Sequence, residues 1–199
     1  IDANRDTPDF SLTISTPTNA DAREIGLAIR SEMQRVGELG ADIATRKATD
    51  HTGEIYDIGL AVGDKLRMFD RVWDRTLRQT ITSNGDVVEL RSLREDGVKI
   101  RNADGIEGFV PWAKIRTGPE APVRLAYGYA LTVDIAQGST ATEHIHALPS
   151  GSQGTQGFKS YVAATRHRER NWIVIDETSE RGEIDERRYN CDDAASTLE

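Results

Sequence analysis

An arginine-rich segment that leads directly into an apolar run constrains this chain more than any other feature. Residues 161–170 have the sequence YVAATRHRER, and the run WIVI at residues 172–175 predicts a buried strand after it. Residues 128–140, GYALTVDIAQGST, predict a second strand that ends in a small polar turn. A strand followed by a polar, glycine-containing loop is a common way to hold phosphate oxygens with backbone N–H groups. An arginine beside such a loop can complete a nucleotide-hydrolysing site by stabilising charge on the transferred phosphoryl group.

Together the two segments resemble motifs V and VI of superfamily 1 helicases, where T-x-x-x-x-Q-G-S couples nucleotide to DNA and Y-V-A-x-T-R carries an arginine finger. On this resemblance Arg166 is the catalytic residue, because a planar, permanently charged guanidinium suits a phosphoryl group in transfer. The resemblance makes Gln137 and Gly138, together with Arg166, the nucleotide-binding residues. We expect Arg168 and Arg170 to lie on a solvated helical face, where the intervening glutamate pairs one of them.

Three hydroxyl-bearing residues of the first motif, two threonines and one serine, are candidate DNA contacts. The resemblance assigns Thr132 to the DNA backbone, and Ser139 and Thr140 can bond a DNA phosphate or cap a following helix. Taken alone, a Gln-Gly-Ser turn is an ordinary strand–turn–helix junction. The presence of both motifs favours the helicase interpretation.

A strand over residues 12–15 and a helix over residues 20–36 are predicted near the start of the chain. The sequence STPTNADAREIGLAIR in this region resembles the segment that begins the second RecA-like domain of RecD-like and conjugative-relaxase helicases. Thr18 and Asn19 precede the helix and either hold a DNA phosphate or simply cap it. The helix carries apolar residues at helical spacing: Ala22, Ile25, Ile29, Met33 and Val36.

Short strand candidates separated by turn signals follow, whereas residues 41–60 are polar and ambiguous. The candidates are residues 65–69, 87–90, 97–101 and 108–112, and the turns contain Asn-Gly or Asp-Gly. This spacing predicts a small antiparallel barrel. The phrase VGDKLRMF is similar to the SH3-like insertion of RecD-like helicases.

One part of the predicted barrel mixes aromatic and basic residues. Phe69 and Trp73 alternate with Arg71, Arg75 and Arg78, which are the ingredients of a platform for single-stranded nucleic acid. Two aspartates in the same stretch dilute its positive charge.

The sequence therefore predicts an α/β fold with an insertion. We expect a RecA-like parallel sheet, of the P-loop NTPase class, from residues 1–62 and 117–199, and a small SH3-like β-barrel inserted over residues 63–116. The α/β pattern is expected to resume with residues 124–129. Within the net charge of −8, residues 63–116 hold 11 Lys and Arg against 9 Asp and Glu, and the tail from residue 176 holds 3 against 9. Because no strongly basic surface results, we expect weak, salt-sensitive binding to DNA.

Several elements of a complete enzyme are missing from the sequence. No G-x-x-x-x-G-K-[ST] motif is present, which argues against a complete small nucleotide-binding enzyme. Since the chain starts at Ile1 rather than Met, we expect a segment of a longer protein, in which ATP and Mg²⁺ are the cofactors and this segment alone is inactive. No metal site is predicted, because Cys191 is the single cysteine and His144 and His146 have no carboxylate at ligand spacing. A cytoplasmic location is expected, because neither a membrane-spanning run nor a signal peptide is found.

Within the superfamily, the two motif segments look closest to TraA/MobF-type conjugative relaxase–helicases. This resemblance implies the C-terminal part of an ATP-dependent DNA helicase. Its partners would be single-stranded DNA, the N-terminal motor domain of the same polypeptide, and relaxosome or transfer-apparatus proteins. RecD-like repair or exonuclease helicases share the motifs and are one alternative. A non-enzymatic SH3-like module that binds a protein is the other, and it would need no Walker A motif upstream of Ile1.

Overall fold

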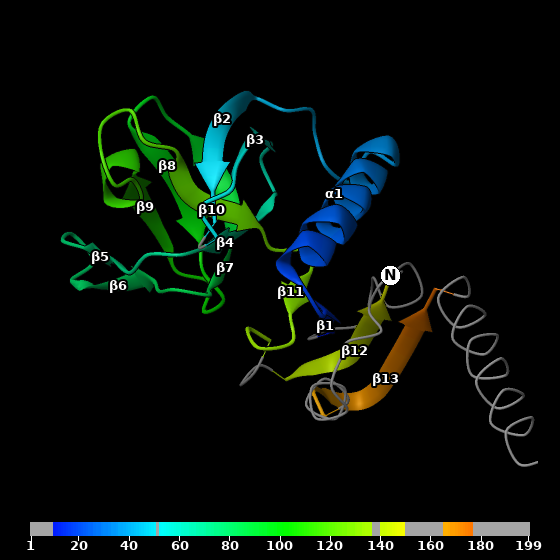
Figure 1. The fold of residues 1–199 in the computed structure, drawn as a ribbon. Helices are drawn as coiled ribbons and strands as arrows, with labels where there is room; N and C mark the ends of the chain where they lie inside the picture. The colour runs from blue at the N-terminus through cyan, green and yellow to red at the C-terminus, as the bar shows by residue number, and fades with distance from the viewer. Residues whose placement is uncertain (1–9, 51, 137–139, 150–164, 177–199) are drawn as a thin grey trace, which may run out of the picture. The chain divides into compact units, whose positions relative to one another are not determined.

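The chain folds into two compact units. The computed structural model describes residues 10–50, 52–136, 140–149 and 165–176. Residues 1–22 and 131–199 make up the first unit, and residues 23–130 make up the second. The first unit is thus built from both ends of the chain, and the second from one continuous stretch (Figure 1).

The first unit contains a four-stranded sheet. Its strands are β1 (Leu12–Thr16), β11 (Leu131–Thr132), β12 (Ala141–Leu148) and β13 (His167–Ile175), in the order β11-β1-β12-β13. Every neighbouring pair is parallel, and the pairs join segments far apart in the sequence. The predicted parallel sheet is therefore confirmed.

Strand β13 forms where the apolar run predicts it, but the predicted burial of that run is wrong. Trp172, Ile173, Val174 and Ile175 are between 44% and 58% exposed. Among the described strands β13 pairs only with β12, so it lies at the edge of the sheet. An edge strand has a neighbouring strand on one side only and is therefore less covered than a central strand, which fits this exposure.

Helix α1 (Asn19–Arg35) confirms the predicted helix, although its buried face differs from the predicted stripe. The buried positions are Ala22, Gly26 and Arg30, whereas Val36 is exposed. Beyond its end, Gly37 has a φ of +80°, and the N–H of Glu38 donates to the carbonyl of Met33 (2.9 Å). This glycine-terminated pattern stops the helix. No helix in the described residues is long and apolar enough to cross a membrane.

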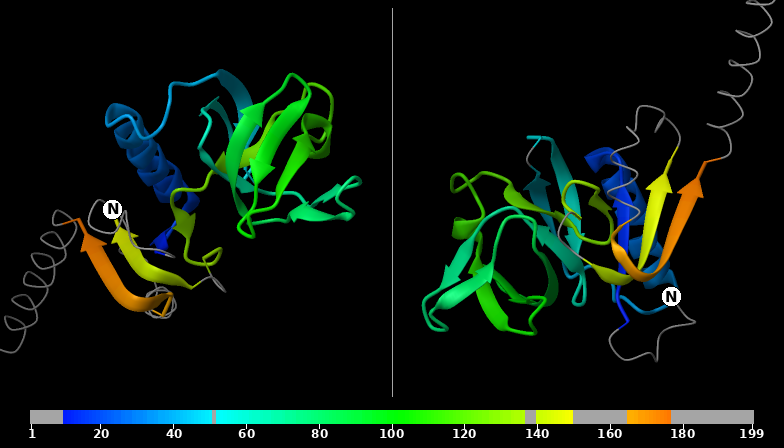
Figure 2. Two further views of the ribbon diagram at one scale, coloured as in Figure 1. Left: turned by 180° about the vertical axis from the view of Figure 1, so that it is seen from behind. Right: turned by 90° about the horizontal axis from the view of Figure 1, so that it is seen from below.

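The second unit contains a curled seven-stranded sheet in the order β3-β2-β10-β4-β7-β8-β9 (Figure 2). The strands are β2 (Ala44–Thr49), β3 (Ile55–Leu60), β4 (Lys65–Met68), β7 (Val87–Leu93), β8 (Gly97–Arg101), β9 (Glu107–Pro111) and β10 (Val123–Tyr127), and a short 3-10 helix, η2 (Trp112–Lys114), follows β9. All neighbours are antiparallel except β2 and β10. The four strands predicted between residues 65 and 112 are confirmed.

This sheet extends beyond the expected insertion of residues 63–116 at both ends. The ambiguous region 41–60 supplies β2 and β3. Residues 124–129 were expected to return to the α/β sheet, and this is wrong, because β10 pairs with β2 and β4. The reason is packing: Val123 and Leu125 are fully buried in the same apolar core as Leu66 and Ile100.

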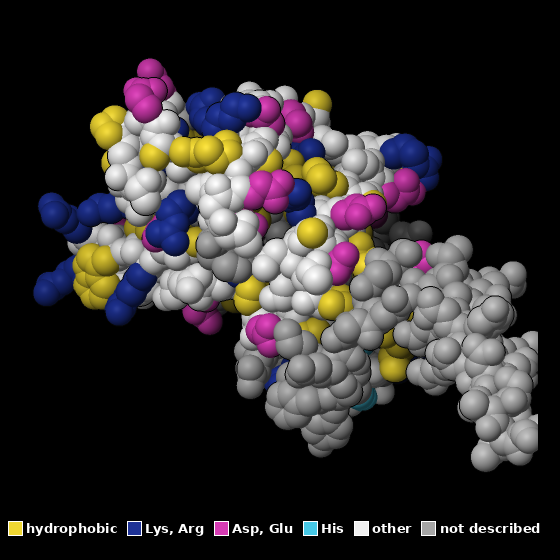
Figure 3. Space-filling view, in the orientation of Figure 1, with side chains coloured by type: hydrophobic (Ala, Val, Ile, Leu, Met, Phe, Trp, Pro, Cys, Tyr) yellow, Lys and Arg dark blue, Asp and Glu magenta, His cyan; other side chains and the backbone are white. Residues whose placement is uncertain are grey.

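A separate two-stranded hairpin, β5 (Val72–Asp74) and β6 (Gln79–Thr82), belongs to the second unit and projects from its curled sheet (Figure 1). At the position of this hairpin, Figure 3 shows Lys and Arg side chains gathered around a hydrophobic cluster. The exposed hydrophobic residues there are Trp73 and Leu77.

Candidate functional site

The parallel sheet of the first unit has a carboxyl edge where β1 and β11 end side by side. Thr16 and Thr132 are register partners at this edge, and both are buried. The N–H of Val133 donates to the carbonyl of Thr16 (3.1 Å), and the N–H of Ala136 donates to that of Thr132 (2.9 Å). These bonds hold the turn that follows β11 against the end of β1.

Thr18 and Asn19 follow β1 at the same edge and begin α1. The Thr18 hydroxyl accepts a hydrogen bond from the Asp21 N–H (3.1 Å) and lies 2.6 Å from the Asp21 carboxylate. Thr18 therefore acts as the N-cap of α1, which is one of the two roles predicted for it. Its side chain is exposed, and that of Asn19 is half-buried.

The opposite, amino edge of the sheet is where β12 and β13 begin. Ala141 and His167 are register partners there, and the Ala141 N–H donates to the carbonyl of Arg166 (3.1 Å). Arg166 is half-buried, and Thr140 next to Ala141 is exposed. The structure therefore brings Thr140 and Arg166 together and separates them from Thr132.

The register of β12 gives the distance between the carboxyl and amino edges of this sheet. Ser15 pairs with His146, whereas Ala141 pairs with His167, so about five residues of β12 lie between the edges. At about 3.3 Å per residue this is roughly 17 Å. Gln137, Gly138 and Ser139 come between Thr132 and β12 in the sequence and lie outside the described residues.

The helical face expected for Arg168 and Arg170 is not found. Both residues belong to strand β13, and both are exposed. Arg170 pairs with Glu143 on the neighbouring strand at 3.7 Å, and not with a glutamate of its own segment. Seven register pairs with β12 favour the strand over a helix in this stretch.

Between the two edges the sheet buries a polar cluster of Ser15, His144, His146 and Asn171. His144 Nδ1 lies 2.8 Å from Asn171 Oδ1, and His144 Nε2 lies 2.9 Å from the Ser15 hydroxyl. The same hydroxyl lies 3.1 Å from His146 Nδ1. If the Asn171 oxygen accepts from His144, then Ser15 donates to His144 and accepts from His146, and both rings are neutral.

Burial explains the charge state of this cluster. Both histidines are almost fully buried, and desolvation is the main cause that lowers the pKa of each. The hydrogen bond to Asn171 acts to raise the pKa of His144, and the nearby charges of His167 and Arg166 act to lower it. In the described residues no group of three or more His, Cys, Asp or Glu side chains is arranged to hold a metal ion.

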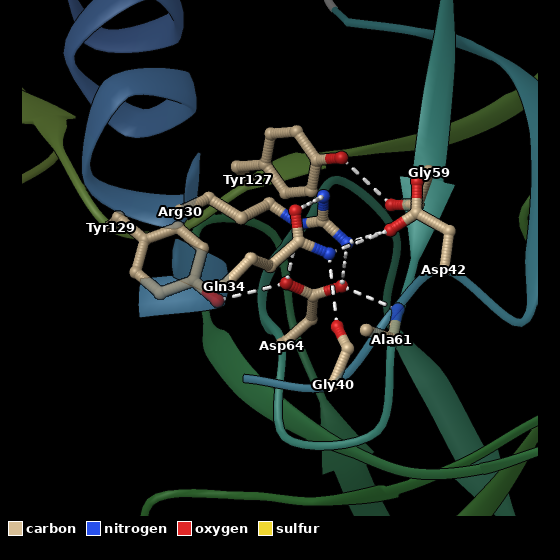
Figure 4. Close-up of polar contacts among 9 residues, drawn as sticks. All are labelled: Arg30, Gln34, Gly40, Asp42, Gly59, Ala61, Asp64, Tyr127 and Tyr129. Carbon is tan, nitrogen blue, oxygen red and sulfur yellow. Dashed lines mark hydrogen bonds and ion pairs between the residues drawn. The ribbon is translucent and has the colours of Figure 1, made fainter. Parts of the chain in front are cut away.

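A second buried polar cluster lies in the second unit and holds α1 against the curled sheet (Figure 4). Arg30 donates through Nε to Asp64 Oδ1 (2.8 Å) and through Nη2 to Asp64 Oδ2 (3.0 Å). It also pairs with Asp42, and its guanidinium lies over the ring of Tyr127 at 5.0 Å from the centroid. Burial acts to lower the pKa of Arg30, but the bonds from Asp64 and Asp42 outweigh it, and the pKa is raised.

The Asp64 carboxylate in this cluster has further donors. The Tyr129 hydroxyl donates to it at 2.8 Å, and the Ala61 N–H donates at 2.6 Å. Burial raises the pKa of Tyr129, and the nearby Asp64 charge raises it further. Burial also raises the pKa of Tyr127, to about 12, and its hydroxyl donates to the carbonyl of Gly59 (2.7 Å). Every charge in the cluster is paired, so it can position α1 rigidly.

Solved structures of Pif1 helicases share this fold. The Bacteroides Pif1 helicase in complex with ADP-AlF3 and ssDNA has a TM-score of 0.55 at 18% identity, with 93% of this chain and 46% of that chain covered. The same helicase bound to ssDNA has a TM-score of 0.54 at 18% identity, with 92% and 46% covered. Pif1 from Candida albicans has a TM-score of 0.52 at 14% identity, with 86% and 47% covered. This chain therefore spans about half the length of these proteins.

At these identities the likeness shows the fold alone, and it confirms the predicted α/β, RecA-like class. No protein-family model and no curated protein matches the sequence. The closer resemblance to RecD-like and TraA/MobF-type helicases, and the SH3-like description of the insertion, stay predictions.

Sequence reasoning missed both buried clusters. His144 and His146 were considered only as metal ligands, although their spacing of two on a predicted strand places them on one face. Arg30 and Asp64 are 34 positions apart, and no local pattern signals their pairing.

Proposed function

We propose that this chain is the second motor domain of an ATP-dependent superfamily 1 DNA helicase. The observation that carries the proposal is the division of one parallel sheet into two edges, with Thr132 at one and Arg166 at the other. Gln137 and Gly138 lie between these two residues in the sequence, and on the motif resemblance they would couple a nucleotide at the amino edge to DNA at the carboxyl edge. The fold shared with Pif1 helicases, one of them solved with ADP-AlF3 and ssDNA, supports this assignment.

At the amino edge, Arg166 would meet the γ-phosphate of ATP. A half-buried arginine whose backbone is fixed by β12, next to the exposed hydroxyl of Thr140, fits a phosphate group by charge and by hydrogen bonding. Bound ATP supplies the phosphoanhydride bond that is hydrolysed. Arg166 would supply positive charge to the oxygens of the transferred group, and the motif resemblance gives Gln137 and Gly138 a role at the same nucleotide. An N-terminal motor domain would hold Mg²⁺ and the β-phosphate.

At the carboxyl edge, Thr132, Thr18 and Asn19 would contact the backbone of single-stranded DNA. The N-terminus of α1 favours a phosphate, and uncharged donors suit contacts that are made and broken during movement along a strand. Since Thr140 lies beside Arg166, a phosphate of the nucleotide is as good a ligand for it as a DNA phosphate. Ser139 precedes it directly.

Within this function we propose a conjugative relaxase–helicase of the TraA/MobF type as the parent protein. The amino-acid sequences of residues 128–140 and 161–170 support this assignment. The alternative of a RecD-like repair or exonuclease helicase rests on the same motifs. A protein-interaction module is the third possibility, and the complete apolar core of the second unit is the observation in its favour.

The test is DNA-stimulated ATP hydrolysis by the parent protein with Arg166→Ala. Loss of an arginine finger lowers turnover by about 10³-fold or more, so we expect at least this loss. The matched control is Arg168→Ala, which removes an exposed arginine two positions along β13 and should leave turnover unchanged. A folded Arg166→Ala protein with normal hydrolysis would overturn the proposal.

A further inference from the structure

The β5–β6 hairpin of the second unit presents an exposed aromatic ring among arginines. Trp73 is 55% exposed and Leu77 is 41% exposed, although both are large apolar side chains. Arg71, Arg75 and Arg78 are exposed in the same hairpin. In the described part of the chain, no carboxylate forms an ion pair with any of these three arginines. Figure 3 shows the resulting patch, with basic side chains around an apolar centre.

The two aspartates that dilute this charge in the sequence are engaged elsewhere. Asp70 pairs with Arg124 on β10 at 2.7 Å. Asp74 Oδ1 accepts the N–H groups of Thr76 (2.7 Å) and Leu77 (3.0 Å) and so closes the hairpin turn. The hairpin therefore offers its arginines to a ligand more freely than its composition suggests.

The base of the hairpin is anchored by buried side chains. Val72, Ile81 and Thr82 at its base are almost fully buried. At its tip Arg78 has a φ of +53°, and it is the only non-glycine residue with positive φ in the described ranges. Such a backbone conformation persists only where the surroundings impose it, and it often marks a functional element.

Arg71 lies beside the exposed ring. Trp73 and Thr80 are cross-strand partners, so their side chains lie on one face of the hairpin. The Arg71 guanidinium donates to the Thr80 hydroxyl through Nε (3.1 Å) and Nη2 (3.0 Å). A flat indole with one guanidinium held beside it, and two more exposed arginines in the same hairpin, matches a base stacked on a ring with phosphates nearby. An acidic peptide would use the charges but would leave the indole without a planar partner.

We infer that the β5–β6 hairpin binds single-stranded nucleic acid, with Trp73 stacked on a base and the three arginines in contact with neighbouring phosphates. This site lies in the second unit and is distinct from the DNA contacts proposed for Thr18, Asn19 and Thr132. It does not depend on Arg166 acting on a nucleotide.

The test is binding of a fluorescent 15-nucleotide oligothymidylate to the 199-residue chain, followed by anisotropy at low salt. Removal of one stacked base weakens binding by about 5- to 150-fold, so Trp73→Ala should lose this much and Trp73→Phe should retain most of the affinity. The matched control is Trp172→Ala, which removes a tryptophan that is 49% exposed in the first unit and should bind like the wild type. Because Trp73 is exposed, its replacement should leave thermal unfolding unchanged.

The arginines are tested by the salt dependence of the same binding. Each phosphate contact contributes about 0.7 to the slope of log K against log salt for a single strand. Arg75→Ala and Arg78→Ala should each lower the slope by about this amount, whereas Arg35→Ala at the end of α1 should not change it.

The inference would be overturned if Trp73→Ala bound the oligonucleotide with wild-type affinity and a variant with alanine at Arg71, Arg75 and Arg78 kept the wild-type salt slope. If a polyglutamate peptide bound as tightly as the oligonucleotide and ignored Trp73→Ala, an acidic protein would be the partner instead. Neither result would touch the proposed function, whose test is the ATPase activity of Arg166→Ala.

Discussion

The two units of this chain bury different chemistry. The second unit encloses a large apolar core that includes Leu66, Leu90 and Ile100, with the buried Arg30–Asp64 pair beside it. The sheet of the first unit buries Ser15, His144 and His146 at its centre, while the apolar side chains of β13 are exposed. The second unit is thus held mainly by apolar packing. In the described part of the first unit, polar side chains are buried at the centre of the sheet and the apolar side chains of its edge strand are exposed.

The largest expected effect comes from the Arg30–Asp64 pair, a buried ion pair of the second unit. Arg30→Met leaves the buried Asp64 without its cation, and breaking such a pair costs about 3–5 kcal/mol. Urea unfolding measures this loss. Arg35→Met on the same helix removes an exposed partner of Glu32 and should change unfolding much less. Equal effects of the two variants would contradict a special role for the buried pair.

A second variant pair compares the two units directly. Ile100→Ala creates a cavity in the fully buried core and should cost about 2–5 kcal/mol. Ile173→Ala on β13, where the side chain is 58% exposed, should change stability by no more than about 0.5 kcal/mol. The same urea titration checks both. A large loss from Ile173→Ala would mean that β13 is covered in solution.

The buried histidines make the first unit sensitive to acid. Burial lowers the pKa of His144 and His146 in the folded state, whereas unfolded histidine has a pKa of about 6.5. Their contribution to stability is therefore fully present above pH 6.5 and is lost as the pH falls below it, by at most about 1.4 kcal/mol per pH unit for each histidine. Urea unfolding followed by circular dichroism at pH 7.5 and 5.5 measures this loss. His144→Asn combined with His146→Asn should remove most of the pH dependence.

The smallest effect is expected at the N-cap of α1. Thr18→Ala removes the acceptor for the Asp21 N–H and should cost about 1 kcal/mol, whereas Thr18→Ser should be nearly neutral. Thermal unfolding measures both. If Thr18 also contacts DNA, Thr18→Ala will weaken oligonucleotide binding in addition, and Thr18→Ser will not.

Local patterns predicted the elements whose causes are local. The helix after Thr18, its stop near Gly37 and the strands between residues 65 and 112 follow from caps, turns and periodicity. Strand β2 was missed because only Ala48 in ATRKAT is buried, so the segment shows no apolar pattern. The buried face of α1 was misjudged because Arg30 is buried through its ion pair with Asp64, which is 34 positions away in the sequence.

The candidate site shows the same limit. Motif resemblance selected Arg166 and Thr132, but nothing in the sequence states that they lie at opposite edges of one sheet. That separation comes from the register of β12 with β1 and β13. The expected helix around Arg170 failed because pairing with β12 decided the conformation of this segment.

The open strand β13 also has a practical consequence for anyone who produces this chain. Its last four residues are apolar and exposed, and among the described strands none pairs with its outer side, which leaves backbone N–H and C=O groups there for a strand of another molecule. Such an edge can recruit a second copy and start aggregation. Purified at high concentration, the isolated chain should self-associate, and a lysine in place of Val174 should keep it dispersed.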